Sequence, residues 1–552
     1  GESGIKNVET ANPLSFSLPE SCVVLADVSG FTNLNEAFST VEGGAEKVTY
    51  HLNQYFTILL DIIEKHGGDC IKFAGDALIV LFKQEPQYER QTYISRVHKH
   101  VKEIKPNQYT CLRAVLCALE LGAQPPYRIT GVRGMEKVKL TLHVAIGYGD
   151  LQALHVGGHN GEWEFLLAGS PFKQLAKAID LSKRGDVVVT KEVWAEVSKH
   201  CKGAKLSGYG TSEVKVQSVI HDVTIITAKP IKIPVTAQKA VRRYVPRMVR
   251  DGLEQGMTRW LAELRAVSVI FVNLKGLLLN RKHNASVERT HQVLRCMQSV
   301  VACNQGYLRQ FLVDDKGTVL IAVFGVPPFS WEDNGYRAVK TAMEISDTLI
   351  ELDVSHAVGI ASGMVYVGSV GSHSRREHAV VGDTVNSAAR LSCKAPPMTV
   401  WVDEATQRQA DRKILMEPCG QIKVKGKNKK IQIYRPIGFN VAGNLLHGPE
   451  VIGREGVLKR CLTALLSVKE SNTKRMIWLT GPAGVGKTVL VGYLYRLAKD
   501  HLQTYYTIGE ATAVGLPHNT GGELVERMLG LTGLSPAMCR FRIMECVNDS
   551  EQ

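Results

Sequence analysis

The sequence predicts an α/β fold in which one α+β sandwich occurs twice and a shorter unit follows. The first observation is an internal repeat, since SCVVLADVSGFTNLNE at 21–36 is answered by AVSVIFVNLKGLLLNR at 266–281. The second is the succession of β-rich apolar runs and helical stretches in both copies, which is typical of layered α/β domains. The third is the glycine-rich run GPAGVGKT at 481–488, which lies behind the repeat.

Three more pairs of segments recur in the same order, which makes a tandem duplication far more probable than chance. We expect each copy to read βααββαβ with a mostly antiparallel sheet. If the copies pack face to face about a pseudo-two-fold axis, as an intramolecular heterodimer, their interface forms two pockets. The matching pairs are 66–82 with 303–325, 140–158 with 354–372, and 165–181 with 379–393.

The repeat sets the predicted domain limits. Residues 1–228 form the first copy, 229–262 a linker, 263–440 the second copy and 441–552 the C-terminal unit. Seven basic residues and no acid lie at 229–250, within an overall excess of 67 Lys and Arg over 53 acids. A nucleic acid or another acidic surface is one partner that such a run could bind. A local basic run more often marks a solvated linker, so no clear nucleic-acid partner is predicted.

Composition limits the location of the protein. No apolar run reaches the roughly 18 residues that span a bilayer, and the start GESGIKNVET has no charged and apolar signal-peptide pattern. The 12 cysteines include no CxxC pair, which fits a reducing compartment. We expect a cytoplasmic protein without a membrane span.

Two carboxylates distinguish the first copy from the second. Asp76 interrupts the apolar run of GGDCIKFAGDALIVLF, where a buried acid is costly unless it is paired or holds a metal. Asp27 matches Asn273 in the second copy, and Asp76 matches Thr318. Two converging carboxylates are oxygen ligands that Mg²⁺ prefers, and two ions so held would activate an oxygen nucleophile and neutralise a triphosphate.

The second copy keeps a complementary pair. Asn386 and Arg390 lie four residues apart on one helix face and match Lys173 and Lys177 in the first copy. One pocket would therefore combine both carboxylates with Asn386 and Arg390, and its twin would be a remnant free to regulate. Taken singly, Asp27 could be a turn cap and Arg390 a surface ion pair.

The motifs LADVSGFTNL, KFAGDALIVLF and VVGDTVNSAARL resemble those of class III nucleotidyl cyclases, over roughly residues 20 to 440. The tandem pair with a phosphate-binding motif behind it is similar to the soluble, bicarbonate-responsive adenylyl cyclases. The resemblance implies attack of the ribose 3′-hydroxyl of ATP on the α-phosphorus, which gives cyclic AMP and pyrophosphate. It also implies two Mg²⁺ or Mn²⁺ ions, held by Asp27, Asp76 and the Val28 carbonyl, with Asn386 orienting the ribose and Arg390 stabilising the transition state.

The chain departs from the family at the base-reading and triphosphate positions. The family's adenine-reading lysine and its polar partner correspond to Gln310 and Ala379, and a triphosphate-binding lysine corresponds to His143. Glutamine can donate to and accept from a purine edge, whereas an alanine side chain offers nothing. Two alternatives stay open: a cyclase with altered purine selectivity, or a weakened, cyclase-derived nucleotide sensor or scaffold.

The anion pocket of the family is also altered. Lys72 stands where the resemblance places a bicarbonate-contacting lysine, but the family's arginine falls at Ala176, with Lys177 beside it. Lys72 could equally be a structural partner of Asp76 or Asp69. An ammonium does not reproduce a guanidinium fork, so we expect weak or absent activation by bicarbonate.

The C-terminal motif predicts the start of an AAA-like P-loop NTPase domain, with a strand in RMIWLT, a phosphate loop and then a helix. Protein partners could bind through this region, and the family resemblance adds an association with cilia or flagella. A glycine-rich loop without nucleotide is the alternative. The residues expected to hold phosphates and Mg²⁺ are Gly481, Gly484, Gly486, Lys487 and Thr488.

Overall fold

The computed structural model describes most of the duplicated body and a smaller part of the C-terminal unit. Asp76 and the side chain of Thr488 lie outside the described residues, so their predicted roles rest on the sequence. The described residues are 12–30, 34, 38, 44–75, 77–84, 92–94, 101–129, 139–206, 212–220, 223, 225, 234–247, 249–250, 263–275, 277, 284–314, 317–327, 329–411, 413–422, 430–439, 451–471, 476–482, 484–499, 524–525 and 528–529.

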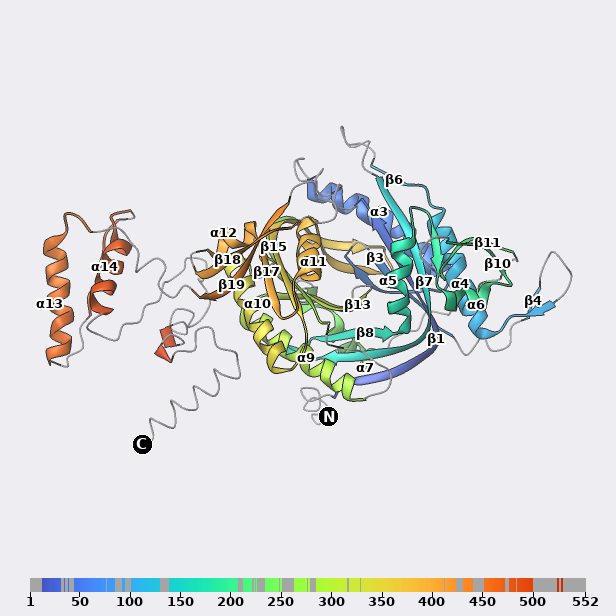
Figure 1. The fold of residues 1–552 in the computed structure, drawn as a ribbon, viewed down its shortest axis with the longest axis horizontal. Coiled ribbons are helices and arrows are strands. Elements are labelled where there is room, and N and C mark those ends of the chain that lie inside the picture. Colours follow the sequence, from blue (N-terminus) through green and yellow to red (C-terminus); the bar gives the residue numbers. More distant parts are fainter. Residues whose placement is uncertain are drawn as a thin grey trace.

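Each copy forms one α/β unit (Figure 1). The first contains β1 (Leu14–Ser29), α3 (Gly44–Lys65), β2 (Asp69–Ala74), β3 (Ala77–Phe82), β4 (Thr92–Ile94), β5 (Val101–Glu103), α4 (Pro106–Gly122), β6 (Tyr127–Arg128), β7 (Lys139–Gly157), η2 (His159–Gly161), β8 (Trp163–Gly169), α5 (Ser170–Leu181), β9 (Val187–Val189), α6 (Lys191–Val197), β10 (Cys201–Lys205) and β11 (Val214–Val219). The second contains β12 (Glu263–Asn273), α9 (Asn284–Cys303), β13 (Tyr307–Asp314), β14 (Gly317–Phe324), α10 (Asn334–Glu351), β15 (Ala357–Gly371), β16 (Arg376–Val381), α11 (Asp383–Lys394), β17 (Thr399–Asp403), α12 (Glu404–Ala410), β18 (Ile414–Ile422) and β19 (Ile431–Phe439).

The main sheets of the two copies have the same strand order. The first runs β2-β3-β1-β7-β9-β11-β10, and the second runs β13-β14-β12-β15-β17-β19-β18. Along both paths only β7–β9 and β15–β17 pair in parallel, as expected for a mostly antiparallel sheet. The predicted order βααββαβ is too short, because the second copy reads βαββαββαβαββ in its described residues. The short strands β10, β11, β18 and β19 lack long apolar runs, so periodicity alone did not reveal them.

Opposite faces of the strands belong to different cores. On β1, Val24 and Ala26 join the core beneath α3 and α4, whereas Val23 and Leu25 join the core beneath α5. This alternation follows from the two-residue period of a strand. Asp27 follows Val23 and Leu25 in this alternation, so it lies on the same face of β1, beneath α5, at the end of the apolar run.

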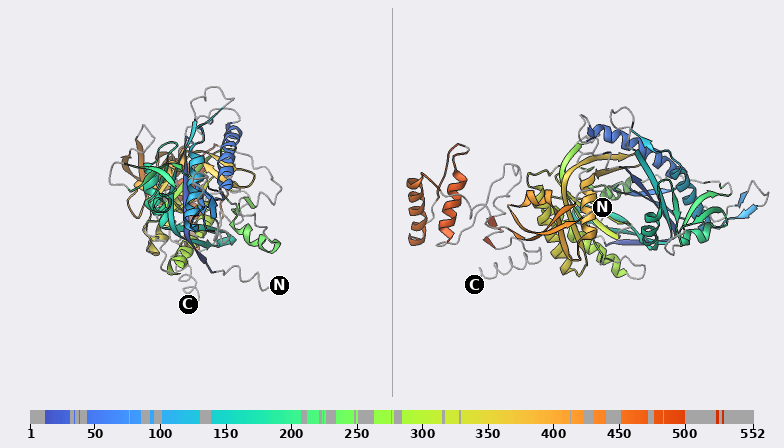
Figure 2. Two further views of the ribbon diagram at one scale, coloured as in Figure 1. Left: turned by 90° about the vertical axis from the view of Figure 1, so that its right-hand side faces the viewer. Right: turned by 45° about the horizontal axis from the view of Figure 1, so that its top comes forward.

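The two copies bury parts of each other. Leu154 and Leu166, from β7 and β8, belong to the core of the second copy. Tyr366 and Ala379, from β15 and β16, belong in turn to the core of the first copy. This exchange agrees with the predicted face-to-face packing, and Figure 2 shows the two sheets side by side.

The remaining segments lie outside the two sheets. In the basic stretch, α7 (Val235–Val241) is followed by the short turn η3 (Arg242–Tyr244), which contacts the first copy, since Tyr244 Oη lies 2.6 Å from His155 Nδ1. In the C-terminal unit, α13 (Glu455–Ser471) and α14 (Lys487–Lys499) pack on each other through Leu458 and Leu494. Among the helices described, none is long and apolar enough to cross a membrane.

The strand expected in RMIWLT is not formed. Residues 476–480 have no β-ladder in the structure, and Met476 and Trp478 are 79% and 77% exposed. A strand needs a neighbour to satisfy its peptide groups, and no sheet partner for this segment occurs among the residues described. The helix after the loop is confirmed as α14.

Candidate functional site

Asp27 lies near the end of β1, between two neighbouring strands. It pairs in register with Ala77 of β3 and with His143 of β7. Its Oδ2 lies 3.0 Å from His143 Nε2, and its side chain is 33% exposed, so the carboxylate is still open to a ligand. Val28, the next residue, pairs with Leu142 but lies beyond the last β1–β3 pair.

The second predicted carboxylate, Asp76, is not among the described residues, but the residues beside it are. Ala74 ends β2 and Ala77 begins β3, and Gly75 between them has φ +69°, which a side chain would disfavour. The Ala77–Asp27 pairing shows that this turn lies beside the end of β1. The convergence of the two acids stays a prediction.

Asn386 and Arg390 lie on α11, which packs closely on β15. A side chain on Gly359 of β15 would come within 2.2 Å of the Ala388 carbonyl, so glycine is required for this close approach. The apolar face of α11 is buried, whereas Asn386 and Arg390 are half-buried on another face. Arg390 Nη1 lies 3.6 Å from Asp383 Oδ1 in the first turn of the same helix, a partly exposed and therefore weak pair.

Gln310 lies in β13 at the interface of the copies and is 3% exposed. Its Nε2 donates to the Phe73 carbonyl of the first copy at 2.5 Å and to Glu377 Oε1 at 3.2 Å. Ala379 is 2% exposed and lies opposite Gly368 in the ladder between β15 and β16. Both predicted purine positions are therefore at the interface and buried.

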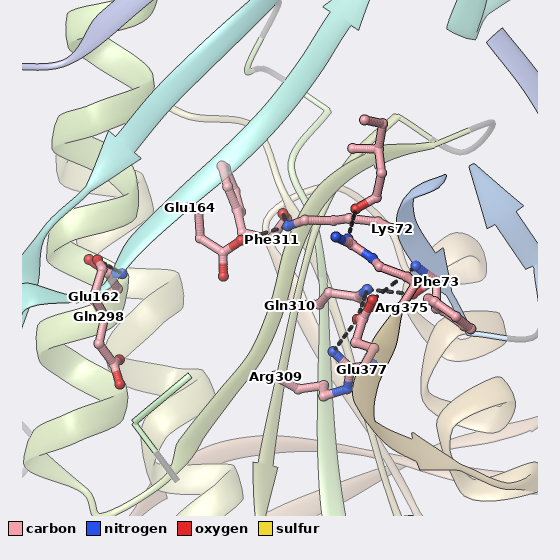
Figure 3. A network of polar contacts seen from close by, with 11 residues as sticks. Lys72, Phe73, Glu162, Glu164, Gln298, Arg309, Gln310, Phe311, Arg375 and Glu377 are labelled. Carbon is pink, nitrogen blue, oxygen red and sulfur yellow. Dashed lines mark hydrogen bonds and ion pairs between the residues drawn. The ribbon is translucent and has the colours of Figure 1, made fainter. Parts of the chain in front are cut away.

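Lys72 is also at the interface, where it already has partners. Its Nζ lies 2.5 Å from Glu164 Oε2 and donates to the Phe311 carbonyl of the second copy at 2.7 Å (Figure 3). The two charged side chains are only 17% and 19% exposed. Beside them is a cavity of about 10 Å³ with mostly apolar walls, which include Phe165.

Lys177, the second predicted cation of this pocket, has a different carboxylate. It lies on α5 (Ser170–Leu181), is 57% exposed, and its Nζ is 3.5 Å from Glu213 Oε1. The structure therefore assigns Lys72 and Lys177 to separate carboxylates. A site for a small anion would have to draw its charge from Lys72, which Glu164 already neutralises.

The glycine-rich loop leads directly into α14. Gly484 and Gly486 have φ values of +82° and +87°, which glycine adopts without strain. Lys487 Nζ donates to the carbonyls of Gly481 and Pro482, at 2.8 and 2.7 Å. The ammonium is thus folded back over the loop that would receive a phosphate.

Three further residues at the interface were missed by the sequence reasoning: Glu164, Glu377 and Arg309. Glu377 accepts from Gln310, from Arg309 Nη1 at 3.0 Å and from the Phe73 backbone N–H at 3.2 Å. The repeat could have revealed both acids, because they occupy matching places in the two copies. Glu164 lies five residues before the glycine that precedes α5, and Glu377 lies five residues before the glycine that precedes α11.

Burial changes the protonation of one neighbour of this cluster. His378 is 7% exposed, and burial, with a smaller contribution from the Arg309 charge, lowers the pKa of its imidazole to about 3. The ring is therefore neutral at physiological pH. The equivalent residue of the first copy is Phe165, which occupies the same place on β8 that His378 occupies on β16.

The comparisons with known proteins agree with this architecture. Residues 263–435 match the family described as adenylate and guanylate cyclase catalytic domain. The resemblance to class III nucleotidyl cyclases is therefore confirmed.

The similar curated proteins include adenylate cyclases of type 10. The chain is 25% identical over 568 residues to adenylate cyclase type 10 of Oryctolagus cuniculus, a match that covers 93% of this chain and 33% of that protein. It is 23% identical over 569 residues to adenylate cyclase type 10 of Homo sapiens, covering 93% and 34%. The chain thus spans about a third of the length of these relatives.

A solved structure of a class III adenylyl cyclase-like ATP-binding protein from Pseudomonas aeruginosa is similar in part. It is 14% identical with a TM-score of 0.46, and the match covers 72% of this chain and 85% of that one.

Proposed function

We propose that this chain is an adenylyl cyclase that converts ATP to cyclic AMP and pyrophosphate at one of its two interface pockets. The observation that carries the proposal is the complementary asymmetry of two otherwise equivalent copies. Asp27 is half-buried near the end of β1, where the second copy has Asn273, which is buried. Asn386 and Arg390 stand on α11, where the first copy has two lysines.

The oxygen donors of the first copy suit Mg²⁺ or Mn²⁺. Asp27 offers a partly exposed carboxylate, and we assign Asp76 and the Val28 carbonyl as further ligands. Hard oxygen donors are the ligands that these ions prefer. Two ions, when bound, would acidify the ribose 3′-hydroxyl and neutralise the triphosphate.

The second copy supplies the remaining groups. Asn386 would orient the ribose so that O3′ lies in line with the α-phosphorus and opposite the leaving pyrophosphate. Arg390 would stabilise the charge that develops on the α-phosphoryl oxygens, because a guanidinium donates two hydrogen bonds in a fixed geometry. In the reaction the O3′–Pα bond forms, the bond to the β-phosphate bridging oxygen breaks, and the 3′-hydroxyl proton is released.

The test is product formation by the purified chain. Cyclic AMP and cyclic GMP are measured with Mg²⁺ or Mn²⁺, with and without bicarbonate at fixed pH and ionic strength. Cyclic AMP formation that depends on the metal and on Asp27 supports the proposal. Nucleotide binding without either product would support the second candidate.

That candidate is a cyclase-derived nucleotide sensor or scaffold. It is favoured by one observation, namely that Gln310 and Ala379 are buried and that the amide N–H groups of Gln310 already have partners. In this case the C-terminal unit would bind nucleotide at the loop of Lys487 and serve assembly. The two candidates differ in turnover, so the same assay separates them.

A further inference from the structure

Two equivalent positions hold the copies together by reciprocal contacts. Lys72 of the first copy donates to the Phe311 carbonyl of the second, and Gln310 of the second donates to the Phe73 carbonyl of the first. In the repeat, Lys72 matches Gln310 and Phe73 matches Phe311. The two contacts are therefore related by the pseudo-two-fold axis, and Figure 3 shows them next to each other.

An acid of the same copy completes each contact. Glu164 lies 2.5 Å from Lys72 Nζ, and Glu377 lies 3.2 Å from Gln310 Nε2. Both acids occupy the same place in the repeat, on β8 and β16. We call these two arrangements the lysine clasp (Lys72, Glu164) and the glutamine clasp (Gln310, Glu377).

The glutamine clasp fixes which way the Gln310 amide faces. An amide NH₂ has two hydrogens, and here its two partners, a carbonyl and a carboxylate, can only accept. The orientation therefore follows from the hydrogen-bond network. Both donors of Gln310 are used, and the group left for a ligand is the acceptor Oε1.

Glu377 is itself held firmly, so this orientation is stable. Its Oε1 accepts from Arg309, whose side chain is 7% exposed, and its Oε2 accepts from the Phe73 backbone N–H. A buried ion pair does not open easily, because each charge would be left without a partner. The carboxylate therefore continues to occupy one hydrogen of Gln310.

We infer that Glu377 is a specificity-determining residue, which makes Gln310 an acceptor toward the purine and so weakens the distinction between ATP and GTP. The inference rests on the proposed function, in which Gln310 contacts the base. A free N–H at this position would bond to N1 of adenine and repel the N1–H of guanine. An acceptor can take the adenine N6 amino group or the guanine N1–H, so this contact rejects neither purine.

The test measures equilibrium binding of 3′-deoxy-ATP and 3′-deoxy-GTP, which cannot cyclise, to the full chain at fixed Mg²⁺. All proteins carry Lys487→Ala, so that the C-terminal loop does not add to the signal. We expect the two Kd values of this reference protein to differ by less than about tenfold, the effect of roughly one hydrogen bond.

Removing Glu377 should free a donor and favour the adenine nucleotide. Because Glu377→Ala alone would leave Arg309 unpaired, the variant is Arg309→Leu with Glu377→Ala, which removes both charges of the buried pair. We expect the Kd ratio to shift toward 3′-deoxy-ATP by about fivefold. The matched control, Lys72→Met with Glu164→Leu, dismantles the lysine clasp and should leave the ratio within about twofold.

The outcomes separate the two proposals. If neither nucleotide binds the reference protein, the proposed function fails and this inference fails with it. If both bind but the ratio is unchanged in Arg309→Leu/Glu377→Ala, only the inference fails. It fails equally if the reference protein prefers one base by more than about 100-fold, or if the control moves the ratio as far as the test variant.

Discussion

Replacing one residue of the lysine clasp should lower the free energy of unfolding of the two copies more than replacing both residues. Lys72→Met leaves the Glu164 carboxylate and the Phe311 carbonyl without the ammonium that both contact. Breaking a fully buried pair costs about 3–5 kcal/mol. The two side chains are 17% and 19% exposed, so solvent screening reduces the expected cost to about 2–3 kcal/mol.

A double-mutant cycle checks this magnitude. Lys72→Met, Glu164→Leu and the double variant are unfolded in urea at pH 7 and followed by circular dichroism. We expect each single variant to lose about 2–3 kcal/mol and the double variant to lose less than about 2 kcal/mol, because no charge is then left unpaired. Single costs that add up within about 0.5 kcal/mol would show that the two residues do not interact, and the reasoning would be refuted.

The same pair predicts the response to bicarbonate. The ammonium is already neutralised by Glu164, and the adjacent cavity of about 10 Å³ has room for at most one water molecule. We expect bicarbonate to change the cyclase rate of the wild-type chain by less than about twofold, a free-energy change of under 0.5 kcal/mol. Strong activation that is lost in Lys72→Ala would place an anion at this residue after all.

Further predictions concern other parts of the chain. Asp27→Ala and Asp76→Ala should each abolish cyclisation without unfolding the protein, and turnover within a few-fold of wild type would contradict the metal assignment. Arg390→Lys should lose most of kcat with little change in KM; a defect confined to KM would count against its role at the transition state. Lys487→Ala should weaken nucleotide binding to the C-terminal unit and spare cyclisation, unless the two regions are coupled. His378 has a folded pKa of about 3 against an ordinary value of 6.5, so the unfolded chain binds a proton that the folded chain does not, and stability should fall as pH drops from about 6.5 toward 3, by at most about 1.4 kcal/mol per pH unit. In urea titrations from pH 4.5 to 7.5, His378→Phe should flatten this dependence, and an unchanged slope would exclude His378 as its cause.

The duplication was predictable because the repeated strands are strongly apolar and carry their polar exceptions at fixed places. Asp27 and Asn273 occupy the same register in the two sheets, opposite Ala77 in one and Val319 in the other, as the alignment of the copies predicted. The identical strand order then follows from folding one pattern twice.

The clasps were not predictable from the same reading. An acid on an edge strand is ordinary in a sequence, and Glu164 and Glu377 have their partners 92 and 67 residues away in the chain. Only packing shows that a glutamine and a lysine at equivalent positions have their donors in use. The missing strand at 476–480 has a related cause, because an apolar run becomes a strand only beside a partner, which this segment lacks in the part of the chain that the structure describes.

Because β7–β8 and β15–β16 are each buried by the other copy, neither copy should be stable when it is produced alone. Each copy, made separately, would present to water the apolar residues that its twin now covers, such as Leu154 and Tyr366. Separate copies should therefore be insoluble or should recombine, as the subunits of an obligate dimer do. Joined in one chain, they meet at a fixed effective concentration. The specific activity of the intact chain should then be unaffected by dilution, whereas that of a co-expressed pair of separate copies should fall.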